Sequence, residues 1–159
     1  MKITFIAVGS TKKAYLKAGI DDYVKRIGRY VKAQIIAVKQ GLSAGKLPNE
    51  ATRLSEAQAI LKRIRPDDFV VVLDENGRAF SSKELADFMD RFMSTGSKGK
   101  TDLAFVVGGA FGVHTDVINR ADMTLSLSRM TLAHELALLT LTEQVYRAYT
   151  IIKNEPYSH

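Results

Sequence analysis

The residues best placed to do chemistry are three glycines that follow a short apolar run. Leu103–Val107 is uninterrupted apolar sequence, too short for a helix, and predicts a strand buried on both faces. Gly108 and Gly109 end the run, and Gly112 follows shortly after. Glycine lets a ligand touch the main chain, and ligands of open α/β sheets bind at the carboxyl ends of strands. The pattern predicts a ligand-binding turn, with an ordinary strand-to-helix turn as the alternative. It is neither a dinucleotide fingerprint nor a P-loop.

A few charged and imidazole side chains could accompany this turn. His134 begins the last predicted helix and faces the proposed pocket, where it is either a base or a structural, capping residue. Asp74 and Glu75 end another strand beside the pocket, although acidic residues are also routine in such turns. His114, His134 and His159 lack metal-ligand spacing and the chain has no cysteine, so no metal site is expected. No Ser/His/Asp arrangement supports hydrolysis.

Length and composition indicate one globular domain, residues 1–159, that can bury a core without disulfides. The sequence has neither a signal peptide nor an apolar run of membrane-spanning length, which predicts a cytoplasmic protein with no membrane partner. The formal net charge is +6, which favours a polyanionic partner or simply aids solubility. Many of the cations gather around the first predicted helix: Lys12, Lys13, Lys17, Lys25, Arg26, Arg29 and Lys32.

Strands alternate with helices along the chain, which predicts an α/β fold with a mainly parallel sheet flanked by helices. Strands are expected at Ile3–Val8, Ala33–Val38, Phe69–Leu73, Leu103–Val107 and Met123–Leu127. Apolar helical stripes are expected at Ile20–Ile27, Leu54–Ile64 and Leu85–Phe92, with a short helix at Thr115–Arg120 and a last helix over about His134–Lys153. Local signals are a loop at Lys39–Pro48, an Asn49 cap, a Glu75–Gly77 turn and a Ser81/Glu84 capping box.

The last helix carries two apolar stripes. One stripe docks a helix on a sheet, and a second calls for another partner, most simply a second copy of the chain. A homodimer is therefore expected. The two stripes are Leu132, Leu136, Leu139 and Tyr146, and Leu138, Leu141, Val145, Tyr149 and Ile152.

Several short motifs together resemble one family. They are Ala7-Val8-Gly9, Tyr23-x-Lys25-Arg26, Leu73-Asp74-x-x-Gly77, Val106-Val107-Gly108-Gly109-x-x-Gly112, Leu125-Ser126-Leu127-Ser128-x-Met130-Thr131 and Glu143-Gln144-Val145-Tyr146-Arg147-Ala148. In this order, over nearly the whole chain, they resemble the RlmH family. These are SPOUT-class methyltransferases that methylate N3 of a pseudouridine in 23S ribosomal RNA of the large subunit.

The resemblance implies properties that the pattern alone does not. These are a C-terminal trefoil knot, a rare exception to unknotted topology, S-adenosylmethionine as cofactor, a homodimer, and action on the ribosome. By motif, the implied cofactor contacts are Leu73, Gly108, Gly109, Leu127, Ser128, Arg129, Met130, Thr131 and Leu132. The implied reaction is direct displacement at the sulfonium methyl group by N3. His134, Tyr157 and His159 are the candidates for the group that takes the N3 proton, with solvent as an alternative.

The sequence departs from the family at three places: Ala133 replaces a usual proline, Leu138 a usual arginine, and the tail ends Pro156-Tyr157-Ser158-His159. These changes concern the RNA side more than the cofactor side, and they leave a non-catalytic RNA- or ribosome-binding module as the alternative function. A second rival, a small α/β enzyme using another nucleotide, lacks the ribose-binding carboxylate that follows a dinucleotide fingerprint.

Overall fold

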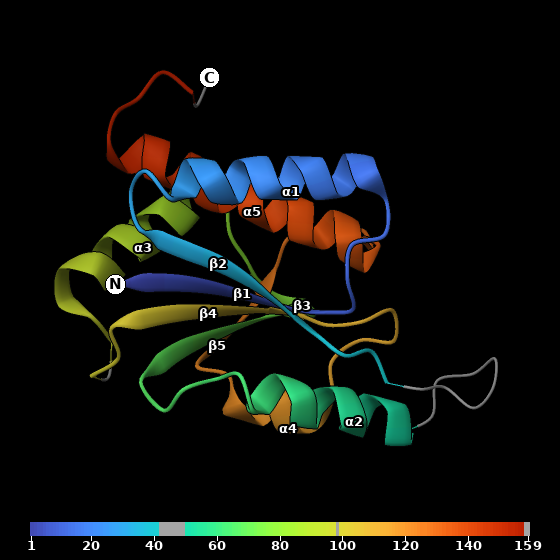
Figure 1. Ribbon diagram of the computed structural model, residues 1–159. Helices are drawn as coiled ribbons and strands as arrows, with labels where there is room; N and C mark the ends of the chain where they lie inside the picture. The colour runs from blue at the N-terminus through green and yellow to red at the C-terminus, as the bar shows by residue number, and fades with distance from the viewer. Residues whose placement is uncertain (42–49, 98, 158–159) are drawn as a thin grey trace.

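The computed structural model describes residues 1–41, 50–97 and 99–157 and contains one five-stranded sheet (Figure 1). The strand order is β2-β1-β4-β3-β5, and every pairing is parallel. The α/β class and the parallel sheet expected from the sequence are therefore confirmed. The strands are β1 (Lys2–Val8), β2 (Lys32–Val38), β3 (Asp68–Ala79), β4 (Asp102–Val107) and β5 (Met123–Ser126).

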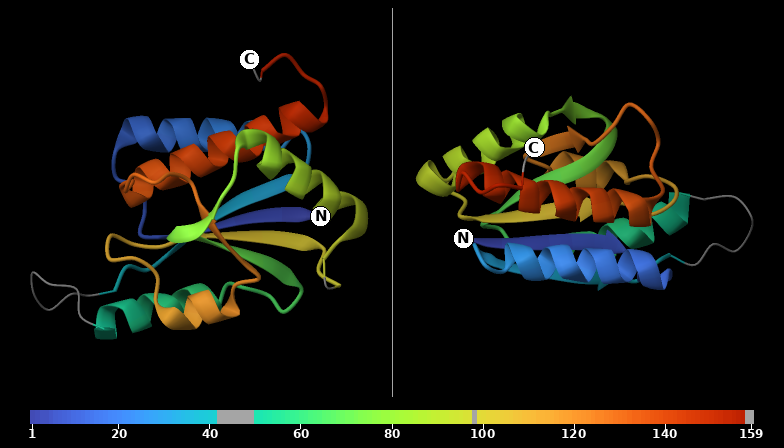
Figure 2. Two further views of the ribbon diagram at one scale, coloured as in Figure 1. Left: turned by 180° about the vertical axis from the view of Figure 1, so that it is seen from behind. Right: turned by 90° about the horizontal axis from the view of Figure 1, so that it is seen from above.

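Five helices cover the two faces of this sheet. They are α1 (Ala14–Ile27), α2 (Glu50–Leu61), α3 (Ser82–Thr95), α4 (Thr115–Arg120) and α5 (His134–Ile152). Helices α1, α5 and α3 lie on one face with α5 in the middle, and α2 and α4 lie on the other (Figures 1 and 2). None of the described helices is long and apolar enough to cross a membrane.

Alternation along the central strand β4 divides the core between the two faces. Leu103, Phe105 and Val107 join the cluster under α1, α3 and α5, whereas Ala104 and Val106 join the cluster under α2 and α4. All five side chains are buried. Because both faces are covered, β4 reads as a continuous apolar run, as the sequence predicted.

Strand β3 differs from its prediction. We expected a strand that ends at Leu73 and a turn at Glu75–Gly77, but the strand runs on to Ala79. Leu125 of β5 pairs with Leu73 and again with Arg78, so the four residues between them form a large bulge. A Cβ atom on Gly77 would stand 2.7 Å from the Leu125 backbone nitrogen. Glycine is thus the residue that lets the bulge close against β5, and what looked like a turn signal marks this approach.

Helix α2 also differs in part. The predicted stripe began at Leu54, but this side chain is exposed, and the buried positions are Thr52, Glu56, Ala57 and Ile60. Apolar periodicity cannot reveal a buried carboxylate. The predicted buried face of α2 therefore differs from the observed one by part of a helical turn. Asn49, the predicted cap, and residues 42–48 of the predicted loop lie outside the described residues. The predicted capping box at Ser81 and Glu84 is confirmed at the start of α3.

Both stripes of α5 find partners within this chain, except at Leu136, which is exposed. The helix packs between α1 and α3 over the sheet, and Leu141 and Val145 are fully buried there. The reason given above for a second copy was therefore wrong, because α1 and α3 supply the second partner. The helix ends at Ile152, one residue earlier than expected. Asn154 takes a left-handed conformation, and the Glu155 amide donates to the Thr150 carbonyl at 2.8 Å, as in a Schellman motif.

Asp122 ties the edge strand β5 to the sheet. One carboxylate oxygen accepts hydrogen bonds from the Val70 amide at 2.9 Å and from Lys100 Nζ at 2.5 Å, and Arg120 lies at 3.4 Å. Burial alone would raise the pKa of Asp122, but these bonds and charges outweigh burial, so its pKa lies below the ordinary value. A depressed pKa in the folded state stabilises the fold at neutral pH, and this contribution is lost as the pH falls through that value.

We therefore expect Asp122→Asn to reduce the free energy of unfolding at pH 7 by about 1.5–3 kcal/mol, the range for hydrogen bonds to a charged group. The difference from the original protein should begin to shrink below about pH 4, where aspartate in the unfolded chain takes up a proton, and should disappear once the pH falls below the depressed pKa of folded Asp122. Urea melts at both pH values measure this. Asp67→Asn is the control, because its ion pair with Arg65 is exposed and should contribute little. Equal losses in the two variants at pH 7 would contradict the assignment.

Candidate functional site

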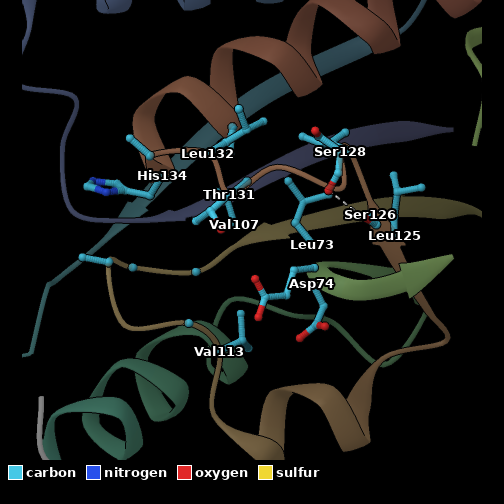
Figure 3. A pocket seen from close by; sticks show the side chains of 18 of the residues that line it. Leu73, Asp74, Val107, Val113, Leu125, Ser126, Ser128, Thr131, Leu132 and His134 are labelled. Carbon is cyan, nitrogen blue, oxygen red and sulfur yellow. Dashed lines mark hydrogen bonds between the residues drawn. The ribbon is translucent and has the colours of Figure 1, made fainter. Parts of the chain in front are cut away.

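A cleft of about 580 Å³ lies at the carboxyl ends of β4 and β5 and at the bulge of β3. Three segments wall it: the β3 bulge, the glycine turn after β4, and the loop that leads from β5 into α5 (Figure 3). Volumes of this size accommodate small-molecule ligands and cofactors. Two strand ends and the β3 bulge therefore meet at one concave site, at the edge where ligands of open parallel sheets bind.

The glycine turn forms one wall. The Gly112 amide donates to the Gly109 carbonyl at 3.2 Å, and Gly112 has a φ of 79°. A Cβ atom on Gly108 would lie 2.6 Å from Val113 Cγ2, across the turn. A Cβ atom on Gly109 would lie 3.1 Å from Glu56 Oε2, on the side of α2. The glycines thus allow the turn to close on itself and to pack against a buried carboxylate, which leaves main-chain atoms facing the cleft.

Glu56 supports this turn from behind. Its carboxylate is almost fully buried and accepts a hydrogen bond from the Gly41 amide at 3.1 Å. The same side chain therefore contacts the end of the β2 segment and the glycine turn. Sequence reasoning missed this residue, because a lone glutamate in a polar helix gives no signal of burial.

Acidic and amide side chains of the β3 bulge form a second wall. Asp74 Oδ1 accepts a hydrogen bond from the Asn76 amide at 2.7 Å, which fixes the conformation of the bulge. Asp74, Glu75 and Asn76 all line the cleft. Two carboxylates at this wall favour a ligand that carries positive charge.

The loop after β5 closes the third side. The Ser126 hydroxyl donates to the Ser128 carbonyl at 3.1 Å, and the Met130 amide donates to Ser128 Oγ at 2.9 Å. These bonds turn the chain tightly, so that Thr131 and Leu132 face Leu73 across the cleft (Figure 3). Such a loop offers main-chain amides and carbonyls to a ligand without requiring particular side chains.

The structure brings most of the sequence-predicted site residues together. Those that line the cleft are Leu73, Gly108, Gly109, Leu127, Ser128, Met130, Thr131, Leu132 and His134. Arg129 is exposed and is not among the lining residues. His159 lies outside the described part of the chain. Of the three candidate bases, His134 is therefore the one described at the cleft.

Tyr157 lies elsewhere. Its hydroxyl lies 3.2 Å from both the Tyr23 hydroxyl and Glu143 Oε1, and the Arg147 guanidinium lies 4.8 Å from the centre of its ring. Tyr146 packs edge-on against it. These contacts lie in the middle of α5, whereas the cleft is lined by the start of the helix; Glu143 is about 14 Å along the helix from His134, and Tyr157 is not among the lining residues. Within one chain, Tyr157 does not reach the cleft.

Some lining residues were not among the predicted site residues. They are Asn76, Ala110, Phe111, Val113, Leu125, Ser126, Ala133 and Ala137. Ala137 could have been found from helical periodicity, since it follows His134 by one turn. Among the described residues, no group of three or more His, Cys, Asp or Glu side chains could hold a metal ion. His114 caps α4, with Nδ1 accepting from the Asp116 amide at 3.1 Å.

The fold and the cleft define an α/β domain that binds a small ligand at the carboxyl edge of a parallel sheet. The family described as "Predicted SPOUT methyltransferase" matches residues 1–159, and the chain belongs to this family. A relative from Lysinibacillus sphaericus, named ribosomal RNA large subunit methyltransferase H, is 42% identical over 160 residues, with 99% of each chain covered.

Solved structures agree on the fold. The tRNA (m1G37) methyltransferase from Aquifex aeolicus has a TM-score of 0.54 and 16% identity, covering 92% of this chain and 70% of its own. A structure described as a methyltransferase of Legionella pneumophila in complex with the cofactor S-adenosylmethionine has a TM-score of 0.52 and 12% identity. The match covers 93% of this chain and 66% of that one. At these identities the likeness concerns the fold alone. The trefoil knot expected from the sequence is implied by membership of the family.

Proposed function

We propose that this chain is an S-adenosylmethionine-dependent methyltransferase that methylates N3 of a pseudouridine in 23S ribosomal RNA of the large subunit. The observation that carries the proposal is the cleft built by the β3 bulge, the glycine turn and the loop after β5. The chain with this cleft also matches, over 99% of its length, relatives named ribosomal RNA large subunit methyltransferase H. The reaction takes place where ribosomes are, which makes the protein cytoplasmic.

The residues of the cleft fit the cofactor. S-adenosylmethionine supplies a methyl group on a positively charged sulfur atom. The main chain of Leu127–Leu132 and of the glycine turn can hold its polar edges, and Leu73 and Leu125 can cover its apolar surface. Asp74 and Glu75 offer negative charge to the sulfonium and the amino group. Arg129, outside the cleft, is available to a phosphate of the RNA instead.

In the proposed reaction, N3 of the base would attack the methyl carbon and displace the sulfur of S-adenosylmethionine as the leaving group. The N3–carbon bond forms as the sulfur–carbon bond breaks, sulfur keeps the electron pair, and the N3 proton leaves. The protein's task is to align donor and acceptor and to exclude water. His134 is the side chain at the cleft that can accept the proton, with solvent as the other acceptor. Burial raises the pKa of Tyr157, with a further contribution from Tyr23, which makes it a poor base at neutral pH.

The basic side chains around α1 form the proposed surface for the RNA backbone. Lys12, Lys13, Lys25, Arg29 and Lys32 are exposed. Two other cations of this helix are neutralised locally, since Lys17 pairs with Asp21 and Arg26 with Asp22. The unpaired cations would contact phosphates and give binding that weakens as salt rises.

A homodimer is also proposed, through the exposed face at the first turns of α1 and α5. These turns lie together, because the Lys12 amide donates to Glu135 Oε1 at 3.0 Å. Large apolar side chains are exposed on this part of the molecule: Tyr15 is 68% exposed, Met130 78% and Leu136 43%. Apolar exposure beside a binding cleft marks an interaction surface.

We expect Leu136→Asp to shift the chain from dimer to monomer at micromolar concentration, because a carboxylate in an apolar interface is costly to desolvate. Leu54→Asp is the matched control: Leu54 is similarly exposed but lies on α2, on the opposite face of the sheet. Sedimentation velocity measures both variants. An unmodified chain that sediments as a monomer would end the idea, as would equal behaviour of the two variants.

The proposed function is tested with ribosomes from cells that lack the modification. We expect the purified protein to transfer a labelled methyl group from S-adenosylmethionine to 23S RNA, and mass spectrometry of the digested RNA to place it on N3 of a pseudouridine. Binding to ribosomes without transfer would instead support the alternative, a non-catalytic RNA-binding module.

A further inference from the structure

A second, smaller cavity of about 280 Å³ adjoins the cleft. Leu125, Ser126 and Leu127 line both cavities, so the two meet along the end of β5. The start of α3 and the middle of α5 supply the other walls. The volume lies just below the usual range of about 300–1,000 Å³ for ligand pockets, which suits a single ring system rather than a whole cofactor.

The walls of this cavity have the composition of a nucleotide site. Its lining includes the aromatic ring of Phe80, the hydroxyls of Ser81, Ser82 and Thr140, and the amide of Gln144. The Arg78 guanidinium lies 4.8 Å from the centre of the Phe80 ring, so a cation stands next to the cavity. Arg78 covers one face of this ring, and its exposed guanidinium suits a phosphate.

The polar groups retain hydrogen-bonding capacity. The Ser82 hydroxyl donates to Gln144 Oε1 at 2.6 Å, and Gln144 Nε2 donates to Glu143 Oε2 at 2.7 Å. These two bonds fix the Gln144 amide and leave it one further N–H donor. Thr140 makes no side-chain hydrogen bond within the described residues, although its hydroxyl can donate. Two donors are therefore available at this wall.

We propose that this second cavity holds the acceptor base, a uracil-type ring removed from its stack, with Thr140 and Gln144 donating to its carbonyl oxygens. The inference rests on the proposed function. In such a ring N3 lies between two carbonyls, and loss of its proton spreads negative charge onto both oxygens. Donors to those oxygens stabilise the anion, so they make the N3 proton more acidic while leaving N3 itself free to attack. The shared β5 end brings the base to the methyl donor in the cleft.

Three variants test this assignment. Thr140→Phe fills the cavity, Thr140→Val removes the hydroxyl at nearly constant shape, and Lys83→Phe adds the same ring at an exposed position of α3 as the control. We expect all three to bind S-adenosylmethionine within about twofold of the original affinity. Thr140→Phe should lower kcat/KM for methyl transfer to ribosomes by at least about 100-fold, the scale of losing a transition-state contact. Lys83→Phe should transfer at the original rate.

The Thr140→Val variant is tested by the pH dependence of kcat, which a purely structural role of Thr140 would leave unchanged. Without one donor the N3 proton is less acidic, so the rising limb of kcat against pH should shift to higher pH. Retained transfer in a well-folded Thr140→Phe variant, or an unshifted pH profile in Thr140→Val, would overturn the assignment.

A binding measurement separates this inference from the proposed function. Pseudouridine 5′-monophosphate, added to the isotope-labelled protein loaded with S-adenosylhomocysteine, should shift the NMR signals of the Thr140 methyl group and the Gln144 side-chain amide. Adenosine 5′-monophosphate should shift them less. If these signals do not respond, the second cavity is not the base site, even if the original protein methylates ribosomes. If they respond but no methyl group is transferred to ribosomal RNA, the proposed function fails and the site remains.

Discussion

Gly109→Val is expected to abolish useful cofactor binding while the fold survives. Even a single methyl group at this position would stand 3.1 Å from Glu56 Oε2 and 3.2 Å from Val8 Cγ1, and valine adds two more carbon atoms. Both neighbours are buried, so the glycine turn must move instead. Overpacking of this kind costs about 1–3 kcal/mol, less than the stability of a typical domain. A displaced cleft wall should lower S-adenosylmethionine affinity by about 100-fold, or about 2.8 kcal/mol.

Calorimetry measures this affinity, and a thermal melt shows whether the variant is folded. Ala51→Val is the control, because Ala51 lies on the exposed side of α2, the helix that carries Glu56. Unchanged affinity in a folded Gly109→Val variant would remove the glycine turn from the cofactor site. A parallel loss in Ala51→Val would show that the effect is general.

Removal of Tyr157–His159 is expected to reduce methyl transfer strongly and also to cost stability. The sequence analysis made Tyr157 and His159 candidates for the group that takes the N3 proton, which is a role in the site rather than in the fold. The structure corrects the second half of that expectation, because Tyr157 packs on Tyr146 and its hydroxyl lies within hydrogen-bond distance of Glu143 Oε1. Losing these contacts should lower the free energy of unfolding by about 1–3 kcal/mol. S-adenosylmethionine affinity should be unchanged, since the described part of the tail is remote from the cleft of its own chain.

Because Tyr157 does not line the cleft of its own chain, we expect any role in transfer to be exerted at the cleft of a second copy. Mixing two inactive variants tests this. One lacks Tyr157–His159, and the other carries Gly109→Val with an intact tail. If the tail of one chain serves the cleft of the other, each mixed dimer has one competent cleft with a tail and should recover up to about half of the activity of the original dimer. No recovery, despite proven exchange of chains, would confine the tail to a structural role. Full transfer by the truncated protein alone would exclude any role in transfer.

Much of the fold followed from local sequence. The runs at the central strands β1 and β4 are apolar because helices cover both faces of the sheet, and such runs are visible without any structure. The capping box of α3 and the bounds of α4 are also local signals and were found. The cleft residues came from a different source. Glycines after β4 indicated the site, whereas the loop residues Leu127–Leu132 were implied by resemblance to a family.

What failed depended on contacts between segments distant in sequence. Glu75–Gly77 has the composition of a turn. Glycine is needed at position 77, however, because the backbone of β5, some 48 residues later in the chain, leaves no room for a side chain there. Glu56 looks like a solvent-facing residue of α2, and only packing against the glycine turn makes it buried.

The amino-acid sequence by itself determined the α/β class, the parallel strands and the glycine turn, because periodicity and backbone preference act over a few residues. Tertiary structure decided which partner each surface finds. The second stripe of α5 faces α1 and α3 rather than another copy, and Tyr157 joins an aromatic cluster rather than its own cleft. It also placed Thr140 and Gln144 beside the end of β5. Such choices depend on the distances and shapes that the assembled sheet imposes, and no local pattern encodes them.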